Sequence, residues 1–288
     1  MPFAEALNEQ AEVNSKRLGK LPAKSSLKQL HFAPLIKPVA PTPPSVVNFW
    51  VRQAPFVARS YGNQSNGCCV RASQAVAATR MERLEQNRTV QFTASEILRV
   101  YYNMTERLYG GGDTGAYEVD GLSEWRKPDL TFRDADGMPH TIDAFLKINH
   151  TDVNEVKRAI AFSGVHGIKV CFALPLAWSK VNPPTTWDIP KNQPMIGQWL
   201  PGGWGGHSTF CTAYDTVGPF IAHTWYEGGK EVYYGLQRVT WRAFLAYADE
   251  ANLVVDSIDS WLHQGLLTPN QAGAITEAVN SVSDQKIQ

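Results

Sequence analysis

The stretch that says most about how this chain folds is residues 61–75, which reads YGNQSNGCCVRASQA. Amides and a glycine lead up to Cys69, and an alanine-rich helical pattern follows it. This arrangement puts a thiol at the N-terminus of a helix, where the helix dipole and free N–H groups favour the thiolate. A thiolate in that position is a candidate nucleophile if a base from elsewhere in the chain lies beside it.

A second stretch, residues 202–215, contains a candidate base. It reads GGWGGHSTFCTAYD, so a glycine-rich loop leads to His207 at the start of a predicted strand. Glycine allows unusual backbone angles and close approach of the main chain, so a histidine there can face a cleft. Each residue alone has an ordinary structural explanation, as a core cysteine or a hydrogen-bonded histidine. Their order and spacing together favour a shared site.

The secondary-structure pattern changes from helices to strands along the chain. Helices are predicted at 69–86, 93–108, 119–127, 152–162 and 240–250, and after 268. Strands are predicted at 168–173, 209–214, 220–225, 231–234 and 253–256. Capping boxes at 93–96 and 268–271 mark two helix starts, and the glycines at 110–112 end a helix. Because helices and strands are segregated, we expect an α+β fold of two subdomains.

The first 45 residues differ from the rest. They are basic and end in PVAPTPP at 38–44, a composition that favours extended chain. We interpret residues 1–45 as an arm or linker; a flexible tail, a pro-segment and a docking arm all remain open. The compact domain is expected at 46–256, with a helical half to about 150 and a β-rich half after it. A C-terminal helical extension, 257–288, follows.

Composition excludes several classes of protein. The 288 residues carry a formal net charge of zero, which gives no reason to expect nucleic acid or an anionic membrane as a partner. No apolar run approaches the ~18 residues of a membrane span. No apolar segment near the N-terminus suggests a signal peptide. Four cysteines are too few for a disulfide framework, so we expect free thiols and synthesis in a reducing cytoplasm. No metal or other cofactor is expected.

Several motifs resemble the papain-like cysteine peptidases. The GCC at 67–69 is similar to their Gly-x-Cys, and GGH at 205–207 to their Gly-His segment, with Ala213 where a glycine is usual. The FIAHTW at 220–225 resembles the strand that carries their Asn-Ser-Trp. Cys69 and His207 are 138 residues apart, within the ~130–150 of that family. The resemblance spans about 41–256 and implies a cleft between a helical half and an antiparallel β-sheet or barrel half.

The resemblance also implies roles. Cys69 would attack a peptide or isopeptide carbonyl, and His207 would hold the thiolate and protonate the leaving amine. The oxyanion would bind the Cys69 N–H together with the side-chain amide of Asn63 or, after a one-residue shift, of Gln64. Asn63 ranks slightly ahead because it needs no shift.

The third catalytic position departs from the family. His223 stands where an asparagine normally orients the histidine, and two close imidazoles resist joint protonation. Asp215 is an alternative orienting group. The remaining expected cleft residues are Gly67, Cys68, Gly110, Gly111, Gly112, Gly206 and Trp225, with Trp225 shielding the catalytic pair from water.

The likeness extends to a divergent branch found in bacteriophage and prophage proteins. It rests on GN at 62–63, on GGH at 205–207, on TW at 224–225 and on TWRAF at 240–244. Three functions follow. The first is a thiol hydrolase acting on a peptide or protein. The second is a catalytically divergent domain in a phage virion, docked to other phage proteins through residues 1–45 and the C-terminal helix. An amidase acting on cell-wall peptide is a third.

Overall fold

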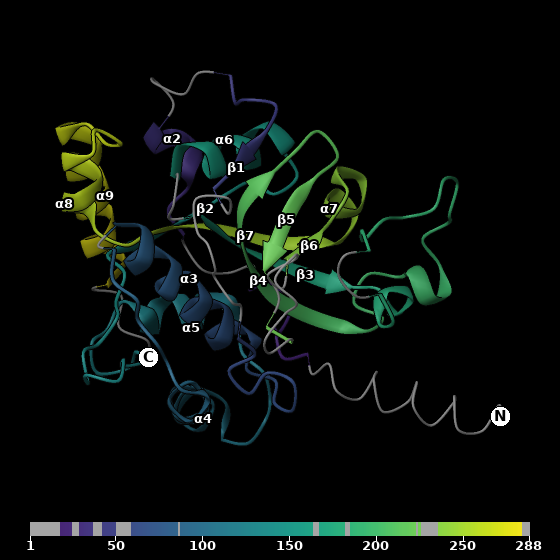
Figure 1. Ribbon diagram of the computed structural model, residues 1–288, viewed down its shortest axis with the longest axis horizontal. Helices are drawn as coiled ribbons and strands as arrows, with labels where there is room; N and C mark the ends of the chain where they lie inside the picture. The colour runs from purple at the N-terminus through teal and green to yellow at the C-terminus, as the bar shows by residue number, and fades with distance from the viewer. Residues whose placement is uncertain are drawn as a thin grey trace.

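The computed structural model describes residues 18–24, 29–36, 42–49, 59–85, 87–163, 167–181, 185–222, 224–225 and 236–283. In this part of the chain a seven-stranded antiparallel sheet has helices packed on both of its faces. Figure 1 shows the helices α3, α4 and α5 gathered on one side and the green strands on the other. The α+β fold class is therefore confirmed.

The helical half contains three main helices: α3 at Cys69–Glu85, α4 at Ala94–Tyr109 and α5 at Glu118–Trp125. All three were predicted to within two residues at either end. The local signals act as expected, because Thr93 accepts a hydrogen bond from the N–H of Glu96 at the start of α4. Gly110 ends the same helix in the left-handed conformation, with φ of 83°.

The sheet runs in the order β2-β7-β3-β4-β5-β6, with β1 pairing on β4. The strands are β1 Val47–Asn48, β2 Ala144–Lys147, β3 Ile168–Leu174, β4 Gly205–Tyr214, β5 Pro219–Ala222, β6 Leu236–Arg238 and β7 Ala248–Val255. In the described residues the end strands β2 and β6 do not pair, so the sheet is open and not a barrel. The strand expected at 231–234 lies outside the described residues.

The predicted helix at 240–250 was wrong at its C-terminal end. Helix α7 covers only Trp241–Tyr247, and Thr240 caps its start. From Ala248 the chain is the strand β7, in which Glu250 lies opposite Cys171 of β3. Pairing with β2 on one side and β3 on the other stabilises β7 as a strand more than local helix propensity stabilises another helical turn.

Short helical elements complete the structure. They are α2 Phe32–Ile36, α6 Val153–Ser163, α8 Ile258–His263 and α9 Pro269–Ser283, with 3₁₀ turns at Leu176–Trp178 and Gly197–Trp199. The capping box at the start of α9 is reciprocal as predicted. The N–H of Thr268 donates to Gln271 Oε1 at 2.9 Å, and the N–H of Gln271 donates to Thr268 Oγ1 at 3.3 Å.

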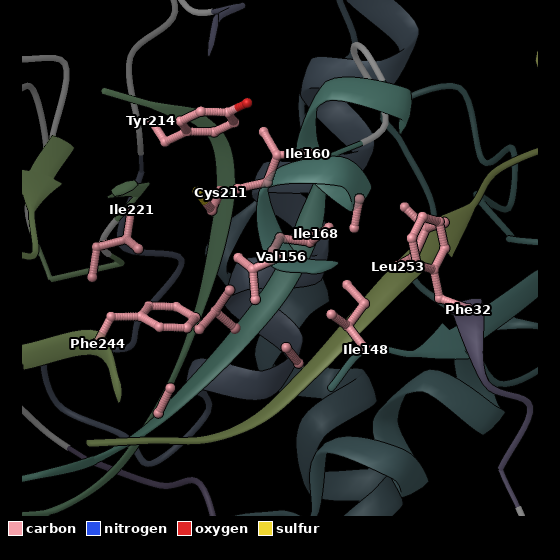
Figure 2. Close-up of a cluster of buried hydrophobic side chains, with 14 of the residues drawn as sticks. Phe32, Ile148, Val156, Ile160, Ile168, Cys211, Tyr214, Ile221, Phe244 and Leu253 are labelled. Carbon is pink, nitrogen blue, oxygen red and sulfur yellow. The ribbon is translucent and has the colours of Figure 1, made fainter. Parts of the chain in front are cut away.

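Two apolar clusters lie on opposite faces of the sheet. On one face Val156 and Ile160 of α6 pack over the strands, together with Phe244 of α7 (Figure 2). On the other face α3, α4 and α5 cover a different set that includes Phe210 and Val254. Leu253 and Val254 belong to opposite clusters, since successive side chains of a strand point to opposite faces.

Described parts of the first 45 residues pack against the domain. The N–H of Lys147 on β2 donates to the carbonyl of Leu30 at 2.6 Å. Phe32 of α2 is buried and meets Phe162 edge to face at 6.3 Å between centroids. The division into an arm, a domain and an extension stays a prediction, but Phe32 belongs to the hydrophobic core of the sheet and Leu30 packs against it.

Candidate active site

The structure brings the start of helix α3 against the start of strand β4. Cys69 is the first residue of α3 and is fully buried. The N–H of Ser208 donates to Cys69 Sγ at 3.5 Å, and His207 directly precedes Ser208 on β4. Two residues 138 positions apart in the sequence therefore lie at one place in the fold.

His207 is covered on one face by an aromatic ring. Its imidazole stacks on Trp225, with ring centroids 4.0 Å apart and planes at 19°. His207 is fully buried and Trp225 is nearly so. The indole therefore covers one side of the imidazole, and its role in shielding a catalytic pair from water stays a prediction.

An extended piece of the protein's own chain crosses the site. The N–H of Lys20 donates to the carbonyl of Gly206 on β4 at 3.1 Å. On the other side, Ala116 N–H donates to the carbonyl of Gly19 at 2.7 Å, and Leu21 N–H donates to the carbonyl of Ala116 at 2.9 Å. Residues 18–21, called the covering segment below, thus lie in a groove between the β-rich half and the helical half.

Glycines let this segment approach closely. A Cβ at Gly19 would lie 1.7 Å from the carbonyl oxygen of Gly67, just before the two cysteines. A Cβ at Gly206 would lie 2.1 Å from the carbonyl oxygen of Lys20, and one at Gly115 would lie 2.4 Å from that of Gly19. Only main chain fits between these walls, so the groove is shaped to hold a polypeptide backbone.

Within the glycine-rich stretch 110–116, the contacts with the covering segment come from Gly115 and Ala116. A Cβ at Gly110 or Gly112 would meet nothing within 4 Å, and one at Gly111 would just reach the backbone of Glu106. The role expected for Gly110–Gly112 in the cleft therefore stays a prediction. The contacting residues belong to the same glycine-rich stretch, three to six positions further along.

The covering segment also changes the chemistry of the thiol. Burial raises the pKa of Cys69 to about 11, although the N–H groups of Ser208 and Gly19 donate to the sulfur and act in the opposite direction. The helix N-terminus alone predicted a thiolate. Here the loss of water around the sulfur outweighs that effect, so the thiol is protonated at neutral pH.

The neighbouring Gly67 and Cys68 are held by the helical half. The N–H of Gly67 donates to Asp113 Oδ1 at 2.7 Å, and the hydroxyl of Tyr101 donates to the same oxygen at 2.7 Å. Cys68 is buried among the side chains of that half, and its Sγ lies 3.8 Å from the carbonyl oxygen of Tyr61. Burial raises the pKa of the Cys68 thiol strongly.

The two candidate oxyanion donors are both engaged by the segment next to His223. Asn63 Nδ2 donates to Thr224 Oγ1 at 2.8 Å, and Gln64 Nε2 donates to the carbonyl of Trp225 at 2.8 Å. The turn before Cys69 is thereby tied to the residue that stacks on His207. Which amide serves an oxyanion stays a prediction.

For the third catalytic position, His223 lies outside the described residues. Asp215, the alternative, is far from His207. The two residues are eight positions apart along one strand and its turn, or about 26 Å at ~3.3 Å per residue. Asp215 instead accepts from the N–H groups of Val217 and Gly218 in the β4–β5 turn and pairs with Arg238 at 2.6 Å. It therefore does not orient His207.

A buried polar network lies under the candidate pair. Ser208 Oγ donates to Glu118 Oε2 at 2.7 Å, and Lys169 Nζ donates to Ser208 Oγ at 2.8 Å. Lys169 also donates to Ser73 and lies 3.5 Å from Glu118 Oε1. Lys169 and Glu118 are both fully buried. The network joins the strand after His207 to α3 and α5, so it connects both halves directly below Cys69.

Reasoning from the sequence missed Lys20, Glu118, Lys169 and Glu250. One signal was available: Lys169 is the lone charge in the apolar strand IKVCFAL at 168–174, and a buried charge requires a partner. Nothing in the sequence pairs it with Glu118 or places Lys20 beside β7. Those contacts depend on how the two halves pack.

Alkaline pH should destabilise the protein. The pKa values of Cys69 and Cys211 are raised by burial to about 11 and about 12, against ~8.5 in an unfolded chain. The folded state keeps protons that the unfolded state releases, so stability is retained below pH ~8.5 and is lost as pH rises through the folded values. We expect the free energy of unfolding, measured in urea with reductant, to fall by about 1.4 kcal/mol per pH unit for each cysteine above pH ~9. Cys211→Ala should make the slope shallower. An unchanged free energy from pH 8 to 10 would contradict this.

No group of three or more His, Cys, Asp or Glu side chains in the described ranges is arranged to bind a metal ion. Over those ranges no helix combines the length and the apolar character needed to cross a membrane.

Comparison with known proteins identifies the fold. No family model and no curated protein matches the sequence. Among solved structures, the chain is similar to xylellain, a cysteine protease from Xylella fastidiosa, at 18% identity and a TM-score of 0.62, over 84% of this chain and 97% of that one. A Carica candamarcensis cysteine protease in complex with E-64 matches at 11% identity and 0.53, over 74% and 99%. Digestive procathepsin L 3 of Tenebrio molitor larval midgut matches at 14% and 0.53, over 86% and 79%. The chain therefore has the two-part papain-like fold.

Proposed function

We propose that this protein is a papain-like thiol hydrolase that cleaves peptide or isopeptide bonds through Cys69 and His207. The observation that carries the proposal is the covering segment. A stretch of extended polypeptide pairs with Gly206 on one wall and Ala116 on the other, and its Gly19 N–H meets the Cys69 sulfur. A groove that holds a peptide backbone against a cysteine is suited to a peptide substrate.

In this proposal Cys69 transfers its proton to His207 once the covering segment leaves and attacks the substrate carbonyl as the thiolate. His207 then protonates the leaving amine. Trp225 keeps water from the imidazole, and His223 orients it. The oxyanion forms at the start of α3, where the Cys69 N–H and the amide of Asn63 or Gln64 are the proposed donors.

The test is labelling by a short peptide that carries a thiol-reactive electrophile, in full-length Lys20→Ala protein. This change removes the ammonium that anchors the covering segment. We expect labelling at Cys69, none at that position in Cys69→Ser, and a rate lowered about 10²- to 10⁴-fold in His207→Ala. His263→Ala, at an exposed histidine, is the matched control and should keep the full rate. No labelling of the folded protein would rule the proposal out.

A second candidate is a catalytically divergent papain-like domain that serves as a structural component of a bacteriophage particle. The full burial and raised pKa of Cys69 favour it, because a permanently covered thiol does no chemistry. It predicts that Cys69 stays unlabelled even when Lys20 is replaced, and that the protein is found in purified particles.

A further inference from the structure

We infer that the groove contains an anionic site, formed by Asp249 and Glu250 of β7, that selects a lysine side chain in the substrate beside the scissile bond. Lys20 occupies this site in the structure. The inference rests on the proposed hydrolase function, because the ligand of this site is a substrate only if the protein is a hydrolase. The site itself rests on the contacts of Lys20.

The ammonium of Lys20 is enclosed by acidic groups of strand β7. Its Nζ lies 2.5 Å from Asp249 Oδ2 and 3.8 Å from Glu250 Oε2, and the Lys20 side chain has no exposed surface. A lysine is rarely buried to this extent unless it is paired. Burial lowers the pKa of Lys20, but Cys171, Asp249 and Glu250 raise it, and the net change is upward. The side chain is therefore held as a cation.

Without Lys20 the site carries excess negative charge. Burial and the charge of Glu118 raise the pKa of Glu250, which shows that the acidic groups crowd one another. Lys169, the cation beside Glu118, is already bound to Glu118, Ser73 and Ser208. An added cation relieves this repulsion, and a carboxylate side chain would increase it.

Acceptor atoms remain available in the same place. In the described residues, Asp249 Oδ1 and Asn252 Oδ1 are buried and accept no hydrogen bond. A lysine ammonium brings three donors, whereas an uncharged alkyl side chain of equal length brings none. The acidic groups are therefore suited to a cation that donates hydrogen bonds.

The site is next to the candidate catalytic pair. Lys20 N–H donates to Gly206, the residue before His207, and the preceding residue, Gly19, donates to the Cys69 sulfur. A peptide that replaces the covering segment would thus put one side chain on Asp249 and Glu250 while its backbone lies at Cys69. That side chain determines which peptides bind.

The first experiment measures binding without chemistry. The peptide LGKLPA, which repeats residues 18–23, and its counterpart with norleucine for lysine are titrated into full-length Lys20→Ala protein by calorimetry. Norleucine keeps the alkyl chain and lacks the charge. We expect the lysine peptide to bind about 10- to 100-fold more tightly. In proteins that also carry Asp249→Asn and Glu250→Gln the ratio should approach one. Glu106→Gln, at an exposed carboxylate of α4, is the matched control and should leave it unchanged.

The second experiment measures the rate at which peptide electrophiles label Cys69. They carry lysine, norleucine or glutamate at either of the two positions nearest the reactive group. We expect lysine to be fastest and glutamate slowest at one position. Labelling at equal rates, or equal binding of the two LGKLPA peptides, overturns the lysine site and leaves the hydrolase proposal standing. If the lysine peptide binds more tightly but no electrophile labels Cys69, the lysine site serves only the protein's own Lys20 and the hydrolase proposal is wrong. Should Lys20→Ala not fold, Lys20→Met keeps the alkyl stem and serves in both experiments.

Discussion

Lys20→Glu should raise the rate at which iodoacetamide alkylates Cys69 by about 100-fold or more. The substitution places a carboxylate beside Asp249 and Glu250, where the structure holds an ammonium. An unpaired charge at a buried position costs about 3–5 kcal/mol, and each 1.4 kcal/mol changes a population tenfold. The covering segment should therefore leave the groove in a large fraction of molecules. This outcome requires only that the segment covers the thiol, and does not require peptidase activity.

The measurement is intact mass followed by peptide mapping, because the chain has four cysteines. Cys211 is buried away from Lys20 and reports on the rest of the fold, whereas Cys68 directly precedes Cys69 and Cys171 interacts with Lys20. Lys24→Glu is the matched control, since Lys24 pairs with Asp120 at 2.7 Å but its side chain is partly exposed. It should change the rate only a few-fold. If all four cysteines react together, the protein has unfolded and the local explanation is wrong; an unchanged rate at Cys69 would also contradict it.

Lys169→Met should destabilise the protein by about 3–5 kcal/mol, which is a large part of the stability of an ordinary domain. The substitution leaves the fully buried Glu118 without its cation and removes a donor to Ser73 and Ser208. Glu118→Gln alone should also destabilise, because it leaves the Lys169 ammonium uncompensated. The free energy of unfolding should fall much less in the double variant than the sum of the two decreases in the single variants.

Urea unfolding at constant pH gives these free energies, provided that the slope with denaturant stays the same among the variants. If the loss of free energy in the double variant equals the sum of the two single losses, Lys169 and Glu118 do not act as a pair. Arg99→Met, which removes the exposed pair with Glu96 on α4, is the matched control. It should cost less than about 1 kcal/mol.

Local sequence signals account for most of the elements and for the two central residues of the site. The capping groups at Thr93 and Thr268 each bond to the residue three positions later, as their spacing indicates. A glycine before Cys69 and two before His207 were recognisable without any structure. Such features depend on residues close together in the chain, and their geometry is set by a few backbone angles.

The boundary between α7 and β7 was not predictable in this way. Residues 248–250 continue a helical pattern in the sequence. In the fold they are a strand, because their backbone pairs with β3. Asp215 was wrongly offered as an orienting group, because eight positions along an extended strand put it about 26 Å from His207 at ~3.3 Å per residue. The boundary between α7 and β7, in contrast, depends on contacts with residues far away in sequence.

By itself, the sequence determined the order of helices and strands, the cysteine at a helix start and the histidine at a strand start. Only the tertiary structure decided that the covering segment lies across Cys69, that Lys20 meets Asp249 and that burial keeps the thiol protonated. The reason is physical. Helix starts and turns depend on neighbouring residues, whereas a pKa and an ion pair depend on which distant groups exclude water and bring charge. Those groups come together only when the two halves pack.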